Sequence, residues 1–293
     1  MAIAALTSII WGFGFVVAKF GLESYSASQL TALRFLVICP LVIFVPRPRV
    51  SLLYVAMIGA TLFTGQFILL FFALANGMPP GLASVTQQLQ AFFTVALAAA
   101  FLKERPTRRQ SVGLAIALSG LFFIALTVGS DLRPIALALA LGAAFSWSVG
   151  NLLVKRVAGE PILPLMIWSS LVPPLPALLI SRWLDPDPNL WHALSGASWL
   201  SLGAVVYLSL AASFLAYAAW GSLLQRFPAS AVAPFALITP CTGFIAAALT
   251  IGELFSPVRY VGMALIFIGL LITVLPQMFP PRRQQRFRND GLS

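Results

Sequence analysis

Side chains that could bind a polar ligand are concentrated in one apolar stretch, residues 79–102, which contains three glutamines. At 100° per residue, one face of a helix here carries Ser84, Gln87, Gln90 and Thr94. Gln88 lies at the edge of that face. Because an amide in a bilayer needs a hydrogen-bond partner, this face could line a cavity that binds a zwitterion. The alternative is hydrogen bonding between neighbouring helices, and the number of polar groups favours the cavity.

Two further stretches supply candidates for the same cavity. In residues 198–225, one helical face carries Ser209, Ser213, Tyr217 and Trp220. This face could form an aromatic wall for an apolar substrate side chain, with ordinary packing as the alternative. Trp11 and Trp147 occupy matching positions in the two halves of the chain, and Asn151 follows Trp147 by one turn. They could mark a central cavity, although core packing is the simpler explanation for Trp147.

Two prolines interrupt the apolar stretch 228–252. Pro234 and Pro240 each lack an N–H group, so each disturbs the preceding turn and frees a carbonyl, near Ser230 and Ala236 respectively. Such carbonyls could accept hydrogen bonds from a substrate ammonium. A kink that only shapes the bundle is the alternative, and we expect the kink in either case.

Charged residues inside the apolar stretches are few. Lys19 and Arg34 are expected to extend to the membrane interface, with an ion pair from Lys19 to Glu23 or an outer gate as alternatives. No Asp, Glu or His falls at mid-depth in any predicted span. This absence argues against a proton relay through carboxylates and leaves facilitated diffusion, or coupling through other groups.

The composition predicts the elements that position these residues. Hydrophobic residues make up 60% of the 293 residues and charged residues only 9%, against about 25% charged in soluble domains. Apolar runs of nearly 20 residues recur along the chain, which is the length that crosses a bilayer. We predict an all-α polytopic membrane protein with ten transmembrane helices, at 3–22, 28–46, 52–75, 79–102, 110–128, 132–155, 162–183, 198–225, 228–252 and 257–276.

The distribution of basic residues predicts the orientation. The net charge is +10, but the basic residues sit in short loops and in the tail rather than on a soluble face, so we predict no nucleic-acid partner. Thirteen of the 18 lie on one side if both termini are cytoplasmic, as the positive-inside rule expects. Arg282–Arg288, in the tail, is expected to be solvated or to contact anionic membrane lipid.

The sequence also contains an internal repeat. Glu104, Gly113 and Gly120 recur 149 residues later as Glu253, Gly262 and Gly269. Trp11 and Lys19 recur 136 residues later as Trp147 and Lys155. Because each half holds five spans, the halves must enter the membrane from opposite sides, an inverted arrangement typical of secondary transporters. We predict a first five-helix repeat at 1–130, a second at 131–276 and a basic cytoplasmic tail at 277–293.

The repeat units resemble the drug/metabolite transporter superfamily, specifically its EamA-type ten-helix members. The resemblance rests on Trp11, on the unit ending at Glu104, and on its second copy with Pro234-Phe235, Pro240, Gly243 and Gly252-Glu253. Within the superfamily the chain looks most like the YddG-type amino-acid exporters. That resemblance implies export of aromatic or other neutral amino acids across a bacterial inner membrane. Ala91 stands where the second copy has Pro240, so we expect span four to lack the kink of span nine.

The sequence thus predicts a secondary transporter that exports amino acids or related metabolites by alternating access, without a carboxylate proton relay. A channel-like metabolite pore and a non-transporting membrane scaffold are the alternatives. No metal-ligand spacing, phosphate-binding glycine loop or nucleophile–base arrangement is apparent, so we predict no enzyme activity, metal or cofactor. The expected partners are a small-molecule substrate and membrane lipid, and the expected state is a monomer.

Overall fold

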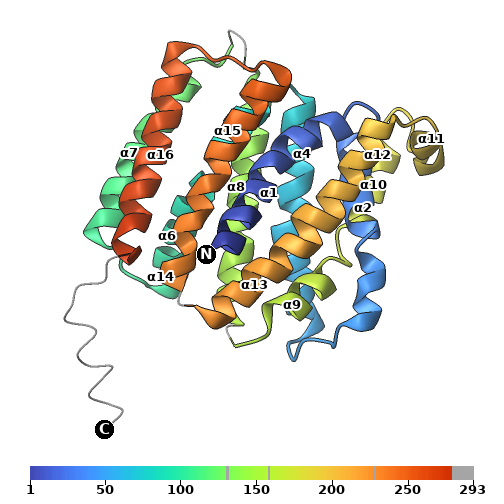
Figure 1. Cartoon of the computed structure of the whole chain (residues 1–293), viewed down its shortest axis with the longest axis horizontal. Helices are drawn as coiled ribbons and strands as arrows, with labels where there is room; N and C mark the ends of the chain where they lie inside the picture. Colours follow the sequence, from blue (N-terminus) through green and yellow to red (C-terminus); the bar gives the residue numbers. More distant parts are fainter. Residues whose placement is uncertain (130–131, 158, 228, 279–293) are drawn as a thin grey trace.

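The computed structural model describes residues 1–129, 132–157, 159–227 and 229–278, and these are largely helical (Figure 1). The helices of the first half are α1 (Ala2–Gly21), α2 (Ala27–Leu36), η1 (Cys39–Phe44), α3 (Leu52–Ile58), η2 (Gly59–Gly65), α4 (Gln66–Ala75), α5 (Pro80–Thr86), α6 (Leu89–Leu102) and α7 (Arg108–Ala125). Those of the second half are α8 (Pro134–Arg156), α9 (Ile162–Ser169), α10 (Pro174–Leu184), α11 (Leu190–Ser195), α12 (Trp199–Val206), η3 (Tyr207–Leu215), α13 (Ala216–Arg226), α14 (Ala229–Val232), η4 (Ala233–Leu237), α15 (Ile238–Ile251) and α16 (Pro257–Met278).

The all-α membrane class is confirmed. Among the described residues, nine continuous helical stretches are long and apolar enough to cross a membrane. The remaining predicted span corresponds to α7, which is 18 residues long and begins with two arginines and a glutamine that lower its mean hydropathy. In Figure 1, α7 nevertheless runs beside α16 along one edge of the bundle.

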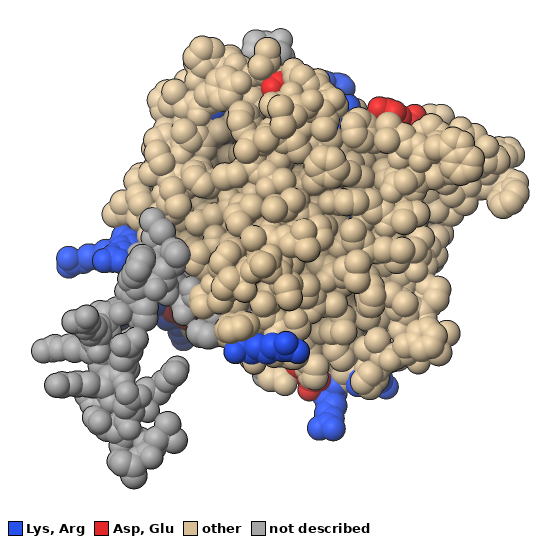
Figure 2. Space-filling model, in the orientation of Figure 1, with Lys and Arg blue, Asp and Glu red and all other residues tan. Residues whose placement is uncertain are grey.

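Loop contacts place the ends of the helices on two opposite sides. At one end, Lys155 pairs with Glu104, and the Arg49 N–H donates to Glu160. At the other, Gln29 donates to the Asp187 carbonyl. Figure 2 shows charged side chains gathered near these ends and a continuous surface of other residues between them. Such an uncharged band fits the hydrocarbon layer of a membrane. The tail arginines predicted to be cytoplasmic lie outside the described residues.

Interruptions of the helices recur at an interval of 149 residues. α6 and α15 are each 14 residues long, and both end in a left-handed residue, Lys103 (φ 56°) and Gly252 (φ 66°). The π-helical turns η2 and η3 also correspond. Within them, Thr64 and Ser213 each donate to the carbonyl five residues earlier. The repeat seen in the sequence is therefore matched by a repeat in backbone geometry.

Span four is irregular at the position that matches the irregular part of span nine. α5 ends at Thr86 and α6 begins at Leu89, and at Gln87 and Gln88 between them the chain keeps right-handed helical dihedrals but forms tighter hydrogen bonds, without a proline. Polar side chains account for the irregularity, because the Ser84, Thr86 and Gln88 side chains all donate to backbone carbonyls within the same span. Such bonds compete with regular helical hydrogen bonding. The irregularity coincides with the end of η4 in span nine.

Paired glycines bring α7 and α16 into close contact. A Cβ atom on Gly120 would lie 2.5 Å from the Gly262 carbonyl oxygen, and one on Gly269 would lie 2.4 Å from the Gly113 carbonyl oxygen. Neither approach leaves room for a side chain. Small residues at such positions let membrane helices pack through their backbones. These glycines therefore allow close packing at the edge of the bundle and do not line the site described below.

We expect Gly120→Ala to destabilise the folded protein by about 1–3 kcal/mol, because the added methyl group must push α7 away from α16. A melting curve in detergent measures this. Gly203→Ala is the matched control, since a Cβ atom at that position in α12 meets nothing within 4 Å. Equal melting temperatures for the two variants would contradict the proposed packing.

Candidate substrate site

A cavity of about 150 Å³ lies among helices of both halves. An engineered cavity of similar volume binds benzene, so a small molecule fits here. The polar residues that line it are Arg34, Gln66, Gln87, Gln88, Gln90 and Thr239. The aromatic residues that line it are Trp11, Phe15, Phe67, Phe71, Trp147 and Tyr217. The site thus combines amide groups, one cation and an aromatic wall.

The glutamines of span four line the cavity at the irregular turn between α5 and α6. The Gln87 side chain donates to the Ala140 carbonyl of α8 at 3.0 Å. Gln90 accepts from the Asn151 amide at 3.0 Å, so its carboxamide is tied to α8 as well. The sequence offered two hypotheses for these glutamines, a cavity lining and hydrogen bonding between helices. Each describes part of the arrangement, because the amides join two helices and also face the cavity. The bonds fix the side chains in place, which suits a preorganised binding site.

Two other predicted residues of span four donate hydrogen bonds to backbone carbonyls instead. Ser84 is fully buried and donates to the carbonyls of Gly81 and Pro240. Thr94 donates to the Gln90 carbonyl at 2.7 Å. Neither of them lines the cavity.

The aromatic wall comes from α1, α8 and α13. Tyr217 lies at the centre of a cluster in which its ring centroid is 5.6 Å from Trp11 and 6.4 Å from Trp147. The indole N–H of Trp11 donates to the Ala212 carbonyl at 2.9 Å, which fixes the ring. The Trp220 ring packs at a tilt against Trp11, with the ring centroids 5.2 Å apart, and does not line the cavity itself. The three lining rings offer an apolar face to a ligand.

The two prolines lie behind the cavity wall. Pro234 is in the 3-10 turn η4, and Pro240 is buried in α15. Neither lines the cavity, whereas their neighbours Ala236 and Thr239 do. The carbonyl of Pro240 accepts from Ser84, which joins spans nine and four. The prolines thus act on the shape of the wall rather than through contacts of their own.

Arg34 does not extend to the membrane interface, which corrects the expectation from the sequence. It is only 4% exposed and lines the cavity. Its Nε group donates to the Ser213 hydroxyl at 2.8 Å, and its guanidinium carbon lies 3.7 Å from the centroid of Phe67. Seven residues separate it from the start of α2, which puts it about 10 Å along the helix. That depth was the signal in the sequence. Ser213 thus faces Arg34 rather than the main cavity.

Gln66 was not predicted as a site residue. It is 5% exposed and lines the cavity at the first position of α4, directly after the π-helical turn η2. Its side-chain oxygen is buried and accepts no hydrogen bond within the described part of the chain. The signal in the sequence is a glutamine inside an apolar span, and its position after a π turn, a feature frequent at functional sites, is visible only in the structure.

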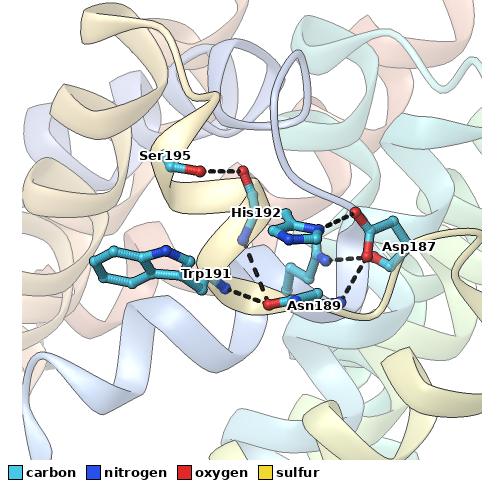
Figure 3. Close-up of polar contacts among 6 residues, drawn as sticks. Asp187, Asn189, Trp191, His192 and Ser195 are labelled. Carbon is cyan, nitrogen blue, oxygen red and sulfur yellow. Dashed lines mark hydrogen bonds and ion pairs between the residues drawn. The ribbon is translucent and has the colours of Figure 1, made fainter.

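The loop around His192, residues 187–195, is called the histidine loop below and lies at the end of the bundle, apart from the cavity (Figure 3). The His192 ring lies 3.4 Å from the Asp187 carboxylate, and both side chains are more than half exposed. Asn189 accepts from the backbone N–H groups of Trp191 and His192, which closes the turn before α11. These residues bind one another and do not line the cavity.

The repeat-related glutamates end their helices in different ways. Glu104 forms a salt bridge of 2.6 Å with Lys155. Glu253 instead accepts from the Gly81 N–H at 2.8 Å, at the start of α5. Burial raises the pKa of Glu253 above its usual value, and the Gly81 N–H, Lys19 and Arg259 partly offset this. Among the described residues Lys19 forms no ion pair with Glu23, which is exposed.

The raised pKa predicts a pH dependence of stability. The Glu253 carboxyl contributes stability that is fully present below its unfolded pKa of about 4.3 and is lost as the pH rises through the folded value. We therefore expect the melting temperature of the wild type, relative to Glu253→Gln, to fall as the pH rises from about 4. Glu23→Gln, at an exposed site, is the control and should leave the pH dependence unchanged. A wild-type curve parallel to that of Glu253→Gln would contradict the assignment.

Comparisons with known proteins agree with this architecture. The model of the EamA-like transporter family matches residues 1–126 and again residues 134–275. A "Probable amino-acid metabolite efflux pump" of Salmonella typhimurium is 38% identical over 93% of this chain and 93% of its own length. A "Probable terminal-alkyne amino-acid exporter" of Streptantibioticus cattleyicolor is 28% identical over 91% of this chain and 90% of its own.

A solved crystal structure shares the fold, with a TM-score of 0.64 over 96% of this chain and 97% of that chain, at 19% identity. The family model covers both halves, and the more similar of the two relatives spans nearly the whole chain. The resemblance inferred from the repeat motifs is thereby confirmed, and the protein is placed among transporters rather than enzymes. The chain belongs to the EamA-like transporter family, within the drug/metabolite transporter superfamily.

Proposed function

We propose that this chain is a secondary transporter that exports amino acids, aromatic and other neutral ones among them, or related small metabolites. The observation that carries the proposal is the cavity, where the Gln87 and Gln90 amides face the same space as the rings of Trp11 and Tyr217. Amides can bind both ends of a zwitterion, and the rings suit an apolar side chain. The names of the relatives, which refer to amino-acid efflux or export, point to the same substrate class.

The proposed arrangement is two inverted five-helix repeats, 1–130 and 131–276, in a bacterial inner membrane with both termini cytoplasmic. The matched interruptions of the helices support the repeat. The contacts among the basic loops support the orientation, because Lys155, Arg49 and their acidic partners meet at one end. A cavity between two inverted halves is the usual position of a transporter site. Since one chain encloses the cavity, we propose that a monomer in membrane lipid is sufficient.

Alternating access is supported by a difference between the two ends of the molecule. The repeat relates Lys155 and Glu104 to Lys19 and Glu253. The first pair forms a salt bridge, whereas within the described residues the second pair forms none. We propose that the pairs mark opposite gates that close in turn as one half tilts against the other.

Transport without a carboxylate proton relay is proposed for a chemical reason. The described residues that line the cavity include no Asp, Glu or His. A relay at mid-depth would require such a group. Export would then follow the substrate gradient.

The proposal is tested by loading proteoliposomes with a panel of labelled amino acids and other small metabolites. We expect release of neutral amino acids faster than from protein-free liposomes, with competition among substrates. Release that never saturates would favour a channel, and no release of any compound would contradict transport.

A further inference from the structure

We infer that Arg34 and Gln66 form a two-point clamp in this cavity, in which Arg34 binds the carboxylate of the substrate and Gln66 accepts from its α-ammonium. The inference rests on the proposed function, because it assigns a substrate class to the proposed site. It also goes further, since it requires that both charged groups of the substrate be unmodified.

Arg34 is a buried cation that forms no ion pair with a carboxylate among the described residues. The described lining of the cavity contains no Asp or Glu, and the hydrogen bond to Ser213 uses only the Nε group. The two terminal nitrogens donate no hydrogen bond to any described residue. A charge in a membrane protein interior is costly when unpaired. An anion from the substrate would offset this cost.

The contacts of the Arg34 guanidinium are compatible with binding of a carboxylate. Its carbon atom lies 3.7 Å from the centroid of Phe67 and 5.8 Å from that of Phe35. These rings and Ser213 hold the group from the protein side, and the remaining N–H groups are left for a ligand. A planar guanidinium binds a carboxylate through two parallel hydrogen bonds, which a lysine cannot reproduce.

Gln66 supplies a hydrogen-bond acceptor for the ammonium group of the substrate. Its side-chain oxygen is buried in the cavity wall and has no hydrogen-bond donor in the described protein. An unsatisfied buried acceptor is unfavourable, and a positively charged donor is the partner that relieves it best. Gln66 precedes Phe67, whose ring lies against the Arg34 guanidinium. The first turn of α4 therefore holds the acceptor and also contacts the cation of α2.

The two groups together select a free α-amino acid. A carboxylate alone would leave the Gln66 oxygen unsatisfied, and an amine alone would meet the Arg34 cation. The aromatic wall of Trp11 and Tyr217 then remains for the side chain. We expect amides and deaminated acids to bind much more weakly than the parent amino acid.

The test measures competition with efflux in proteoliposomes. Phenylalanine, leucine and serine are each compared with their carboxamides and with their deaminated acids. For the wild type we expect each parent compound to inhibit at least about tenfold better than either derivative, since each loses one charge-assisted hydrogen-bonded contact. Equal inhibition by parent and carboxamide would overturn the clamp even without any variant.

Variants then assign the two ends. Arg34→Gln should abolish the preference for the acid over the carboxamide, and Gln66→Leu should abolish the preference for the amine over the deaminated acid. Arg34→Lys should weaken the first preference and keep the second. Arg182→Gln, at an exposed site, should change neither. A purely structural role would lower flux for all compounds equally and leave both ratios intact, and that result would overturn the clamp.

Failure of the clamp and failure of the proposed function give different results. If the wild type exports amino acids but Arg34→Gln retains the wild-type ratios, only the clamp is wrong. If the wild type exports no amino acid at all, the proposed function itself is contradicted.

Discussion

Replacing Gln87 and Gln90 together with leucine is expected to reduce amino-acid efflux by roughly ten- to a hundredfold, from the loss of two hydrogen-bonding groups worth about 1 kcal/mol each or somewhat more. Both amides line the cavity, and leucine has a similar volume without a donor or acceptor. Initial efflux rates from proteoliposomes measure the effect.

The control for this double variant is Gln225→Leu, the same change at an exposed position near the end of α13. It should leave efflux unchanged. The melting temperature in detergent separates a loss of binding from a loss of fold, because Gln87 and Gln90 also join span four to α8. Wild-type efflux in a folded double variant would remove the glutamines from the substrate site.

Trp11→Ala is expected to change which substrates are exported. Its ring lines the cavity and packs against Tyr217, so truncation removes apolar surface that a large side chain would contact. Burying such a side chain is worth about 1.5–3 kcal/mol, which corresponds to roughly a ten- to hundredfold preference. We therefore expect efflux of phenylalanine and leucine to fall by about that factor relative to serine.

Trp191→Ala is the matched control, because Trp191 is 74% exposed in the histidine loop and does not line the cavity. This control should leave the efflux rates of phenylalanine, leucine and serine unchanged. If Trp11→Ala lowered the efflux of all three amino acids equally, the ring would support the fold and would not contact the substrate side chain.

Much of the architecture could be predicted because bilayer thickness and positive-inside charge act on composition alone. The spans near 80–102 and 134–156 follow from apolar length, and the repeat was visible through Glu104 and the spaced glycines. The irregularity in span four was missed because it depends on competition between side chains and the backbone. Ser84, Thr86 and Gln88 look like part of a polar helical face in the sequence, and only the structure shows that their side chains donate to backbone carbonyls within the span.

The candidate site was predicted only in part, because the position of several side chains depends on contacts with residues distant in the sequence. Gln87, Gln90, Trp11 and Tyr217 line the cavity as expected, whereas Ser84 and Thr94 satisfy backbone carbonyls. Arg34 was misplaced because its burial depends on Ser213 and Phe67, which are distant or unremarkable in the sequence. Gln66 was missed because its environment depends on the π-helical turn before it, which no local pattern announces.

The central claim is that this cavity carries substrate by alternating access, and counterflow tests it most directly. Proteoliposomes are loaded with excess unlabelled amino acid and diluted into a trace of the labelled compound, in parallel samples with and without a protonophore. We predict transient accumulation of label that saturates with concentration and is strongly reduced in Gln87→Leu/Gln90→Leu. Passive equilibration without an overshoot, or an overshoot that the protonophore abolishes, would contradict the account.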